Sequence, residues 1–306
     1  MHTETIVAGL IILIIIWAFI ERKLLITTKY EVVSDTLPKE FDGTNFVVLS
    51  DLHNQNFGKD NERLIHKIDL LSPDFILVAG DMINKDTVCY PSTSFTLLEA
   101  LSEKYKIYYG YGNHELKNDM FLKIKGNNQE NKGSMSEEAY STWVEYKENL
   151  IKSNVTILNN ESITIDKGEA KLTITGLSIG GMYFRHFKLP TMTTQYLNQV
   201  IGEHCANYQI LIAHNPCYYN DYLNWGADLV LSGHLHGGLV RLPFIGGLVS
   251  PQVIFFPKYT SGLYRKKEES GKNQKAMIVS RGLGSHSIMP RLFNIPDLVF
   301  VRLKNP

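Results

Sequence analysis

The 306-residue chain has little cysteine, no excess of either charge and only one long apolar run. Its three cysteines, Cys89, Cys205 and Cys217, are too few and too scattered for a disulfide framework or a thiolate zinc site. Lysine plus arginine and aspartate plus glutamate each number 31, so the formal net charge is zero. A neutral chain has no general electrostatic attraction to polyanions, and we therefore expect no nucleic-acid partner.

The single long apolar run covers residues 6–20 and holds about 15 residues without a charge, close to the length that crosses a bilayer. It lacks the polar face of a surface helix, which leaves a membrane anchor, a buried core helix or a signal peptide. Residues 1–5 contain no lysine or arginine, and no small-residue cleavage site follows the run, so a signal peptide is disfavoured. We predict an uncleaved membrane anchor in residues 1–28 and one globular domain in residues 29–306.

Basic residues flank the run on one side only. Arg22, Lys23 and Lys29 follow it, and no basic residue precedes it. Because positively charged flanks stay in the cytoplasm, this asymmetry favours a single-pass protein with a cytoplasmic domain. So few charges leave the extracytoplasmic side open.

The rest of the chain alternates between strand-like and helix-like patterns. Residues 61–71 and 136–153 have apolar side chains at helical spacing, and residues 162–178 resemble a β-hairpin around Asp166-Lys167-Gly168-Glu169. Residues 117–138 are polar, and we expect a mobile surface insertion there. Seven short runs are apolar at nearly every position, which is typical of strands covered on both faces: residues 46–49, 75–79, 107–111, 210–213, 229–231, 277–279 and 298–301. The alternation predicts an α/β fold with mixed sheets.

Five of these predicted strands run into residues that bind metals. The sequences that follow them are Ser50-Asp51-Leu52-His53, Gly80-Asp81, Gly112-Asn113-His114-Glu115, His214 and Ser232-Gly233-His234-Leu235-His236. Ligands of open α/β sheets bind beyond the carboxyl ends of the strands, so these side chains are predicted to converge at one edge. Each motif alone is common, but the ordered set is not.

The residue types favour a pair of borderline divalent metals, such as manganese, iron, zinc, cobalt or nickel. Asp51 and His53 are two residues apart, as are His234 and His236, and such residues point the same way on an extended chain. The ligand set is too large for one ion and suits two, because one carboxylate can bridge a metal pair. Two-metal sites activate water and neutralise phosphoryl charge.

The motif order D-x-H, GD, GNHE, H and GHLH resembles the calcineurin-like metallophosphoesterase superfamily over residues 46–303. Residues 234–263 and 281–296 are similar to its bacterial membrane-associated branch, which includes YkuE-like phosphoesterases and relatives of UDP-diacylglucosamine pyrophosphohydrolase. The resemblance implies a four-layer α/β/β/α sandwich of two mixed sheets, here preceded by one transmembrane helix. It also implies two divalent ions, with manganese, iron or zinc expected.

The resemblance assigns roles to individual residues. One metal would be held by Asp51, His53, Asp81 and His236, and the other by Asp81, Asn113, His214 and His234. His114 would face the phosphate without binding metal and would stabilise charge or protonate the leaving oxygen. Glu115 would support the site. Asn84 occupies the position at which purple acid phosphatases have a tyrosine, so no tyrosinate iron ligand is expected.

The expected function is hydrolysis of a phosphodiester, pyrophosphate or phosphomonoester by metal-activated water, on a small phosphorylated or lipid-linked substrate. A non-enzymatic metal-stabilised scaffold or regulator on the same fold is the alternative, and a nuclease is a third, disfavoured by the neutral charge. The apolar residues 239–257 are either buried core or an exposed lip at residues 242–248, with Arg241 near a phosphate. A lip of this kind would favour lipid-linked substrates.

Overall fold

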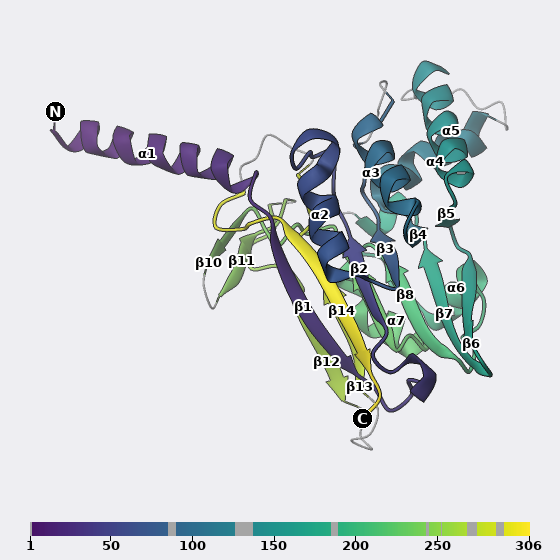
Figure 1. The fold of residues 1–306 in the computed structure, drawn as a ribbon. Helices are drawn as coiled ribbons and strands as arrows, with labels where there is room; N and C mark the ends of the chain where they lie inside the picture. Colours follow the sequence, from purple (N-terminus) through teal and green to yellow (C-terminus); the bar gives the residue numbers. More distant parts are fainter. Residues whose placement is uncertain are drawn as a thin grey trace.

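The structure of the protein is a computed structural model. It describes residues 2–84, 90–125, 137–184, 189–242, 245–251, 253–267, 274–285 and 291–306. Two large sheets lie face to face with helices on their outer sides (Figure 1). The predicted four-layer α/β/β/α sandwich of two mixed sheets is therefore confirmed.

The first sheet carries the first three of the motifs that were predicted to bind metal. Parallel strands β2–β5 place their carboxyl ends at one edge, whereas β14 runs antiparallel to β2. Strand β1 then pairs in parallel with β14 at the rim of the sheet. The spatial order is β1 (Ile26–Val33), β14 (Asp297–Lys304), β2 (Asn45–Leu49), β3 (Phe75–Ala79), β4 (Lys106–Gly110) and β5 (Val155–Leu158).

The second sheet carries the remaining motifs. Its four inner strands are parallel, and its two outer strands are antiparallel to their neighbours. The predicted hairpin is β6 and β7 of this sheet. The spatial order is β12 (Gly262–Lys267), β13 (Gln274–Val279), β9 (Leu229–Ser232), β8 (Tyr208–Ala213), β7 (Ala170–Leu177) and β6 (Ser162–Lys167).

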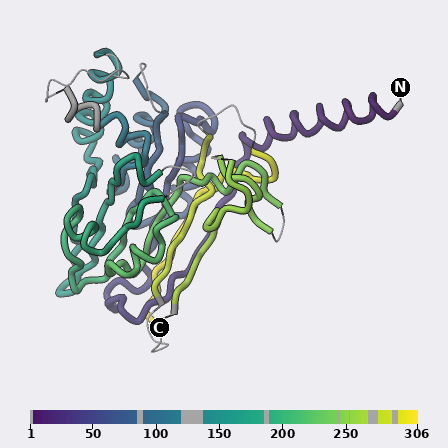
Figure 2. The backbone as a smooth tube through the Cα atoms, turned by 180° about the vertical axis from the view of Figure 1, so that it is seen from behind, coloured from purple at the N-terminus to yellow at the C-terminus, as the bar shows by residue number. Residues whose placement is uncertain are grey.

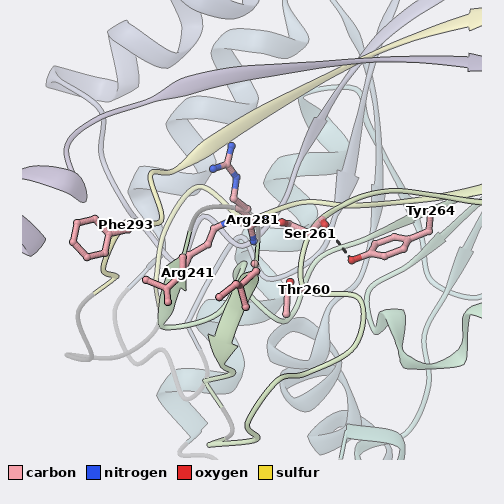
Figure 3. Close-up of a pocket in the computed structure, with 9 residues that line it drawn as sticks. Arg241, Thr260, Ser261, Tyr264, Arg281 and Phe293 are labelled. Carbon is pink, nitrogen blue, oxygen red and sulfur yellow. Dashed lines mark hydrogen bonds between the residues drawn. The ribbon is translucent and has the colours of Figure 1, made fainter.

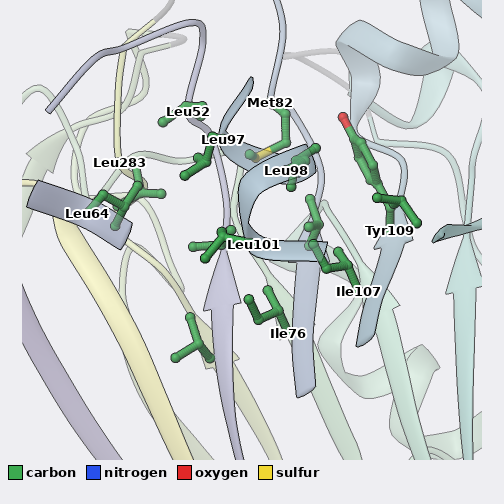
Figure 4. Close-up of a cluster of buried hydrophobic side chains, with 14 of the residues drawn as sticks. Leu52, Leu64, Ile76, Met82, Leu97, Leu98, Leu101, Ile107, Tyr109 and Leu283 are labelled. Carbon is green, nitrogen blue, oxygen red and sulfur yellow. The ribbon is translucent and has the colours of Figure 1, made fainter. Parts of the chain in front are cut away.

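Three buried apolar clusters fill the three interfaces between the layers. The first joins the outer face of the first sheet to α2 (Glu62–Leu71), α3 (Ser92–Ser102) and α5 (Glu137–Lys152). Figure 4 shows the part of this cluster that involves α2 and α3. The second lies between the sheets, and the third joins the second sheet to α6 (Thr194–Ile201) and α7 (Tyr219–Trp225). Strands β3, β8 and β9 are buried at every position because both of their faces are covered.

The structure corrects the expectation of a surface insertion at residues 117–138. Helix α4 runs from Asn113 to Lys125, and α5 begins at Glu137, while residues 126–136 lie outside the described ranges. The polar composition suggested a loop, but residues 113–125 contain neither glycine nor proline to interrupt a helix. Helices α3, α6 and α7 were not predicted from the sequence at all.

Helix α1 (His2–Glu21) projects from the body as a single rod (Figures 1 and 2). Its apolar side chains from Ile6 to Ile20 are mostly exposed, and residues Thr3–Glu21 are long and apolar enough to cross a membrane. Its C-terminal end is attached to the domain: Glu21 is 0% exposed, and its Oε2 accepts a hydrogen bond of 2.8 Å from the Phe293 amide. The neighbouring Asn294 side chain donates to the carbonyls of His236 (2.6 Å) and Gly238 (2.5 Å).

Candidate metal centre

The strand ends of both sheets meet at one buried site. The first sheet contributes Asp51 and His53 after β2, Asp81 after β3, and Asn113 and His114 at the start of α4. The second sheet contributes His214 after β8 and His234 and His236 after β9. The predicted convergence thus arises because the two sheets pack with the carboxyl ends of their parallel strands at the same edge.

Three groups of side chains each place their potential ligand atoms within 4.8 Å of one another. One group holds Asp51, His53 and His236, and a second holds Asp81, His214 and His234. These groups match the two ligand sets expected from the sequence with two differences. Neither group includes Asn113, and Asp81 is in only one of the two. A third group joins His53, Asp81 and His114, so the structure also gives His114 the geometry of a potential ligand.

The Asp81 carboxylate lies between the groups. Its Oδ2 is 3.1 Å from the Nε2 of His214, 3.8 Å from that of His114 and 3.9 Å from that of His53. Asp51 sits beside it, with its Oδ1 3.5 Å from the Nε2 of His236 and 3.8 Å from that of His214. A carboxylate with imidazoles on both sides has the geometry required to bridge two cations.

The imidazole rings are held in place through their other nitrogen. The Nδ1 atoms of His53, His214 and His236 lie 3.2, 2.6 and 3.2 Å from the carbonyl oxygens of Ile83, Ala79 and Gly284. In each ring the Nε2 is therefore the atom directed at the carboxylates. Metal-binding histidines have this arrangement, because the outer hydrogen bond fixes both the tautomer and the ring orientation.

Backbone geometry at the site differs from the sequence prediction. Asp51 and His53 were expected to share a direction on an extended chain, but their φ angles are +51° and +48°. Asp81, His234 and His236 are also left-handed, with φ of +54°, +71° and +49°. Non-glycine residues rarely adopt this region, and such strain concentrates at functional sites. The side chains meet because the chain turns sharply after each strand.

Two motif glycines leave space for the carboxylates. A Cβ built on Gly112 would collide with the Asp81 carboxylate, and one built on Gly233 would collide with the Asp51 carboxylate and the Ser50 hydroxyl. The glycines of GNHE and GHLH are therefore required by close packing around the candidate ligands.

The charges of the site depend strongly on one another. Burial alone would raise the pKa of Asp81, but electrostatic interaction with the neighbouring His214 and His114 side chains holds it well below its usual range. Burial would lower the pKa of His214, yet Asp81 and Asp51 raise it to about 10. Burial raises the pKa of Asp51, so this carboxyl gains from any added cation. His214 and the two carboxylates thus stabilise one another's charged forms.

The donor set fits divalent metals. It combines carboxylate oxygens, imidazole nitrogens and one amide oxygen, the ligands of borderline metals. The Oδ1 atom of Asn113 is buried, and no residue in the described part of the chain donates a hydrogen bond to it. Because an unsatisfied buried oxygen costs free energy, a cation ligated by this atom would remove a penalty.

Glu115 organises the site from behind, as the sequence suggested, although its partners could not be predicted. Its carboxylate accepts hydrogen bonds from the amides of Asp81 (2.9 Å), Met82 (2.8 Å) and Gly112 (3.0 Å) and from the Tyr109 hydroxyl (2.7 Å). It thereby ties the turn after β3 to the turn after β4 and positions Asp81.

We expect Glu115→Gln to lower the free energy of unfolding by about 3 kcal/mol, because an amide NH₂ would oppose buried N–H donors. Tyr109→Phe, which removes a single donor, should cost only about 1 kcal/mol. Urea unfolding in excess EDTA measures both values without any contribution from metal affinity. Equal effects of the two substitutions would contradict the role assigned to Glu115.

Other contributors gave weaker signals in the sequence. The Ser50 hydroxyl donates to Asp51 Oδ2 in a short hydrogen bond, and the carbonyl of Gly284 accepts from His236. The ring of Phe184 lies 5.0 Å from that of His234. Ser50 comes just after β2, and the RGLG run at residues 281–284 comes just after β13. This position at a strand end was the only sequence feature that pointed to them, and no sequence feature pointed to Phe184.

Asn84 lies near the site, and its Nδ2 is 3.5 Å from the backbone oxygen of His53. We expect iron-loaded protein to show no tyrosinate-to-iron charge-transfer band, because this position offers an amide instead of a phenolate. Visible absorption spectroscopy of the ferric sample tests this expectation, with Asn84→Tyr as the matched comparison. A purple wild-type sample would disprove the assignment.

The matching family model is that of the calcineurin-like phosphoesterases, and it matches residues 44–238. The chain therefore belongs to this family of metal-dependent enzymes that hydrolyse phosphoric esters. The match contains all seven candidate ligands and His114, and an enzyme is thus supported over a non-enzymatic scaffold.

Two curated relatives extend the similarity over nearly the whole chain. The uncharacterized metallophosphoesterase YkuE of Bacillus subtilis (strain 168) is 26% identical over 291 residues, covering 94% of this chain and 88% of that protein. The UDP-2,3-diacylglucosamine pyrophosphatase LpxG of Chlamydia trachomatis serovar D is 24% identical over 323 residues, covering 94% and 92%. Among solved structures, a dimetal phosphatase from Danio rerio aligns with a TM-score of 0.41 and 12% identity over 79% of this chain and 88% of that one.

Proposed function

We propose that the protein is a membrane-anchored phosphoesterase with two divalent metals at the candidate metal centre. The observation that carries this proposal is a pair of ligand groups, one with Asp51, His53 and His236 and the other with Asp81, His214 and His234. Asp81 also lies near the first group, with its Oδ2 3.9 Å from the Nε2 of His53. Manganese, iron and zinc suit this mixed oxygen and nitrogen donor set. When bound, two such ions supply an activated water nucleophile and positive charge for the phosphoryl oxygens.

The chain's own residues would divide the remaining work. Asp81 would hold both ions, and Asn113 would supply an oxygen without adding negative charge near an anionic substrate. His114 has its Nε2 at the edge of the site, 3.8 Å from Asp81 Oδ2. From there it can donate a proton to the leaving oxygen of the ester.

The candidate substrates are phosphodiesters, pyrophosphates and phosphomonoesters. Two observations support a lipid-linked substrate: the exposed apolar helix α1, and the similarity to a relative named as a UDP-2,3-diacylglucosamine pyrophosphatase. A panel of an aryl phosphomonoester, an aryl phosphodiester, a soluble nucleotide sugar and a diacylated nucleotide sugar tests the class, with Mn, Fe, Zn and Co supplied separately. We expect turnover of the lipid-linked pyrophosphate to be greatest. No hydrolysis with any metal would favour the scaffold alternative.

We further propose that the anchor within residues 1–28 is α1 and that residues 29–306 form the enzymatic domain together with residues 26–28, which begin β1. The cytoplasmic side is favoured by Arg22, Lys23 and Lys29. The full chain is expected to stay in the membrane pellet after alkaline carbonate extraction. Ile12→Lys with Ile15→Lys should release it, because each charge in a span costs about 3 kcal/mol of insertion free energy. Ile12→Leu with Ile15→Leu is the matched control. Wild-type protein in the supernatant would refute the anchor.

A further inference from the structure

A pocket of about 460 Å³ opens beside β10 (Val240–Leu242) and β11 (Gly246–Val249). None of its lining residues is a candidate metal ligand, so it is a separate site. Figure 3 shows the polar part of the lining, in which the Tyr264 hydroxyl donates to the Ser261 carbonyl at 3.1 Å. The residues that define it are Arg241, Thr260, Ser261, Tyr264, Arg281 and Phe293.

The pocket carries more positive than negative charge. Arg281 is 3.4 Å from the buried Asp297 carboxylate and donates to the Thr28 hydroxyl at 3.2 Å. Within the described residues, no carboxylate oxygen lies within 4.0 Å of the Arg241 guanidinium, whose Nη1 donates to the Gly237 carbonyl at 3.4 Å. Burial and the charge of Arg281 both lower the pKa of Arg241. An anion in the pocket would relieve this repulsion between the two arginines.

Exposed apolar side chains lie in the lining of this pocket and on the segment paired with β11: Ile245 and Phe293 line the pocket, and Phe255 and Phe256 follow β11 and bond or pair with its backbone. Phe255 and Phe256 are 69% and 71% exposed, and Ile245, Val253 and Phe293 are also exposed. For Ile245, Val253, Phe255 and Phe256, which belong to the apolar residues 239–257, the alternative of buried core is wrong, whereas Pro243 and Phe244 of the predicted lip lie outside the described residues. Exposed apolar residues next to cationic ones are typical of surfaces that dip into a bilayer interface.

The surroundings of the pocket place it at the base of α1. The Phe293 amide, at the rim, donates to Glu21 at the end of α1, and β10 and β11 lie beside that end of the helix (Figure 1). If α1 spans a membrane, the pocket and its apolar rim therefore lie at the surface of the leaflet from which the domain end of α1 emerges.

We propose that the pocket binds the phosphate headgroup of an anionic phospholipid of that leaflet, between Arg241 and Arg281. The inference rests on the proposed membrane anchoring, which supplies the lipid surface. The exposed residues Ile245, Val253, Phe255, Phe256 and Phe293 contact the acyl boundary around the headgroup. Lipid binding here holds the metal centre at a fixed distance from the bilayer.

Native mass spectrometry of the full chain in a neutral detergent, with EDTA present, tests this proposal. We expect dioleoylphosphatidylglycerol to bind more tightly than dioleoylphosphatidylcholine, and inorganic phosphate to bind much more weakly than dioleoylphosphatidylglycerol. Arg241→Gln should weaken phosphatidylglycerol binding about fivefold, and Arg241→Lys should retain most of it. Arg302→Gln, at the end of β14 remote from α1, is the matched control for loss of one charge.

Three results would overturn the proposal: equal affinity for the two lipids, no effect of Arg241→Gln, or phosphate binding as tight as lipid binding. A comparison without EDTA adds a fourth: lipid binding that is present without EDTA and absent with it would place the lipid at the metal centre and would also overturn the proposal. The measurement does not require α1 to lie in a bilayer. Failure of the anchor in carbonate extraction is therefore distinguishable from failure of this pocket.

Discussion

Asp81→Asn is expected to remove most bound metal and to lower kcat/KM by roughly 10³-fold or more. Asparagine keeps the shape of the side chain but removes the negative charge. That charge lies 3.1 Å from His214 and 3.9 Å from His53, which belong to different proposed metal positions. Its loss would weaken both positions at once. Elemental analysis together with hydrolysis of an aryl phosphodiester measures the two effects.

Asp69→Asn is the matched control for Asp81→Asn. Asp69 is a partly exposed carboxylate on α2 that pairs with Lys104 at 2.8 Å, remote from the proposed ligands. This variant should retain wild-type metal content and turnover. Two full metal equivalents and normal turnover in Asp81→Asn would refute the shared-carboxylate assignment.

His114→Asn is expected to lower kcat by roughly 10²–10⁴, the contribution of a general acid. Metal content should stay at the wild-type level, because the two proposed ligand sets do not include this residue. Substrates with good leaving groups should lose less activity, since their leaving oxygen needs no proton. Comparing phosphodiesters of increasing leaving-group pKa measures this dependence.

His66→Asn, on the exposed side of α2, is the control for His114→Asn and should change neither quantity. The test also addresses the third ligand group, in which His114 joins His53 and Asp81. If His114→Asn loses a metal equivalent, His114 is a ligand and the general-acid role fails.

Most strands of both sheets could be predicted, because each gives a local pattern in the sequence, whereas β5 and β12 were not predicted. Residues 46–49 and 75–79 are apolar at every position, and in the structure β2 and β3 are covered on both faces. The candidate ligands could be predicted for the same reason, since each directly follows such a strand. Helix α4 was missed because its polar sequence gives no apolar stripe, although nothing in it breaks a helix.

Other features depend on contacts between distant segments and could not be predicted from sequence patterns. The left-handed backbone at Asp51 and His53 follows from the packing of turns around the site, not from residue propensities. Likewise, Arg241 and Arg281 are 40 positions apart, and only the tertiary fold places both in one pocket. Glu115 is similar, because two of its partners come from the turn after β3.

The attachment of α1 has a consequence for preparing a soluble form of the enzyme. Glu21 is the last residue of α1, but its side chain is fully buried in the domain and accepts a hydrogen bond from the Phe293 amide. Asn294, the next residue, is bonded to the carbonyl of His236. A truncation after residue 21 would therefore loosen the loop that supports a candidate ligand. A chain that begins at Trp17 lacks most of the apolar helix but keeps the buried residues Ala18 and Glu21. It should therefore yield the better-ordered protein.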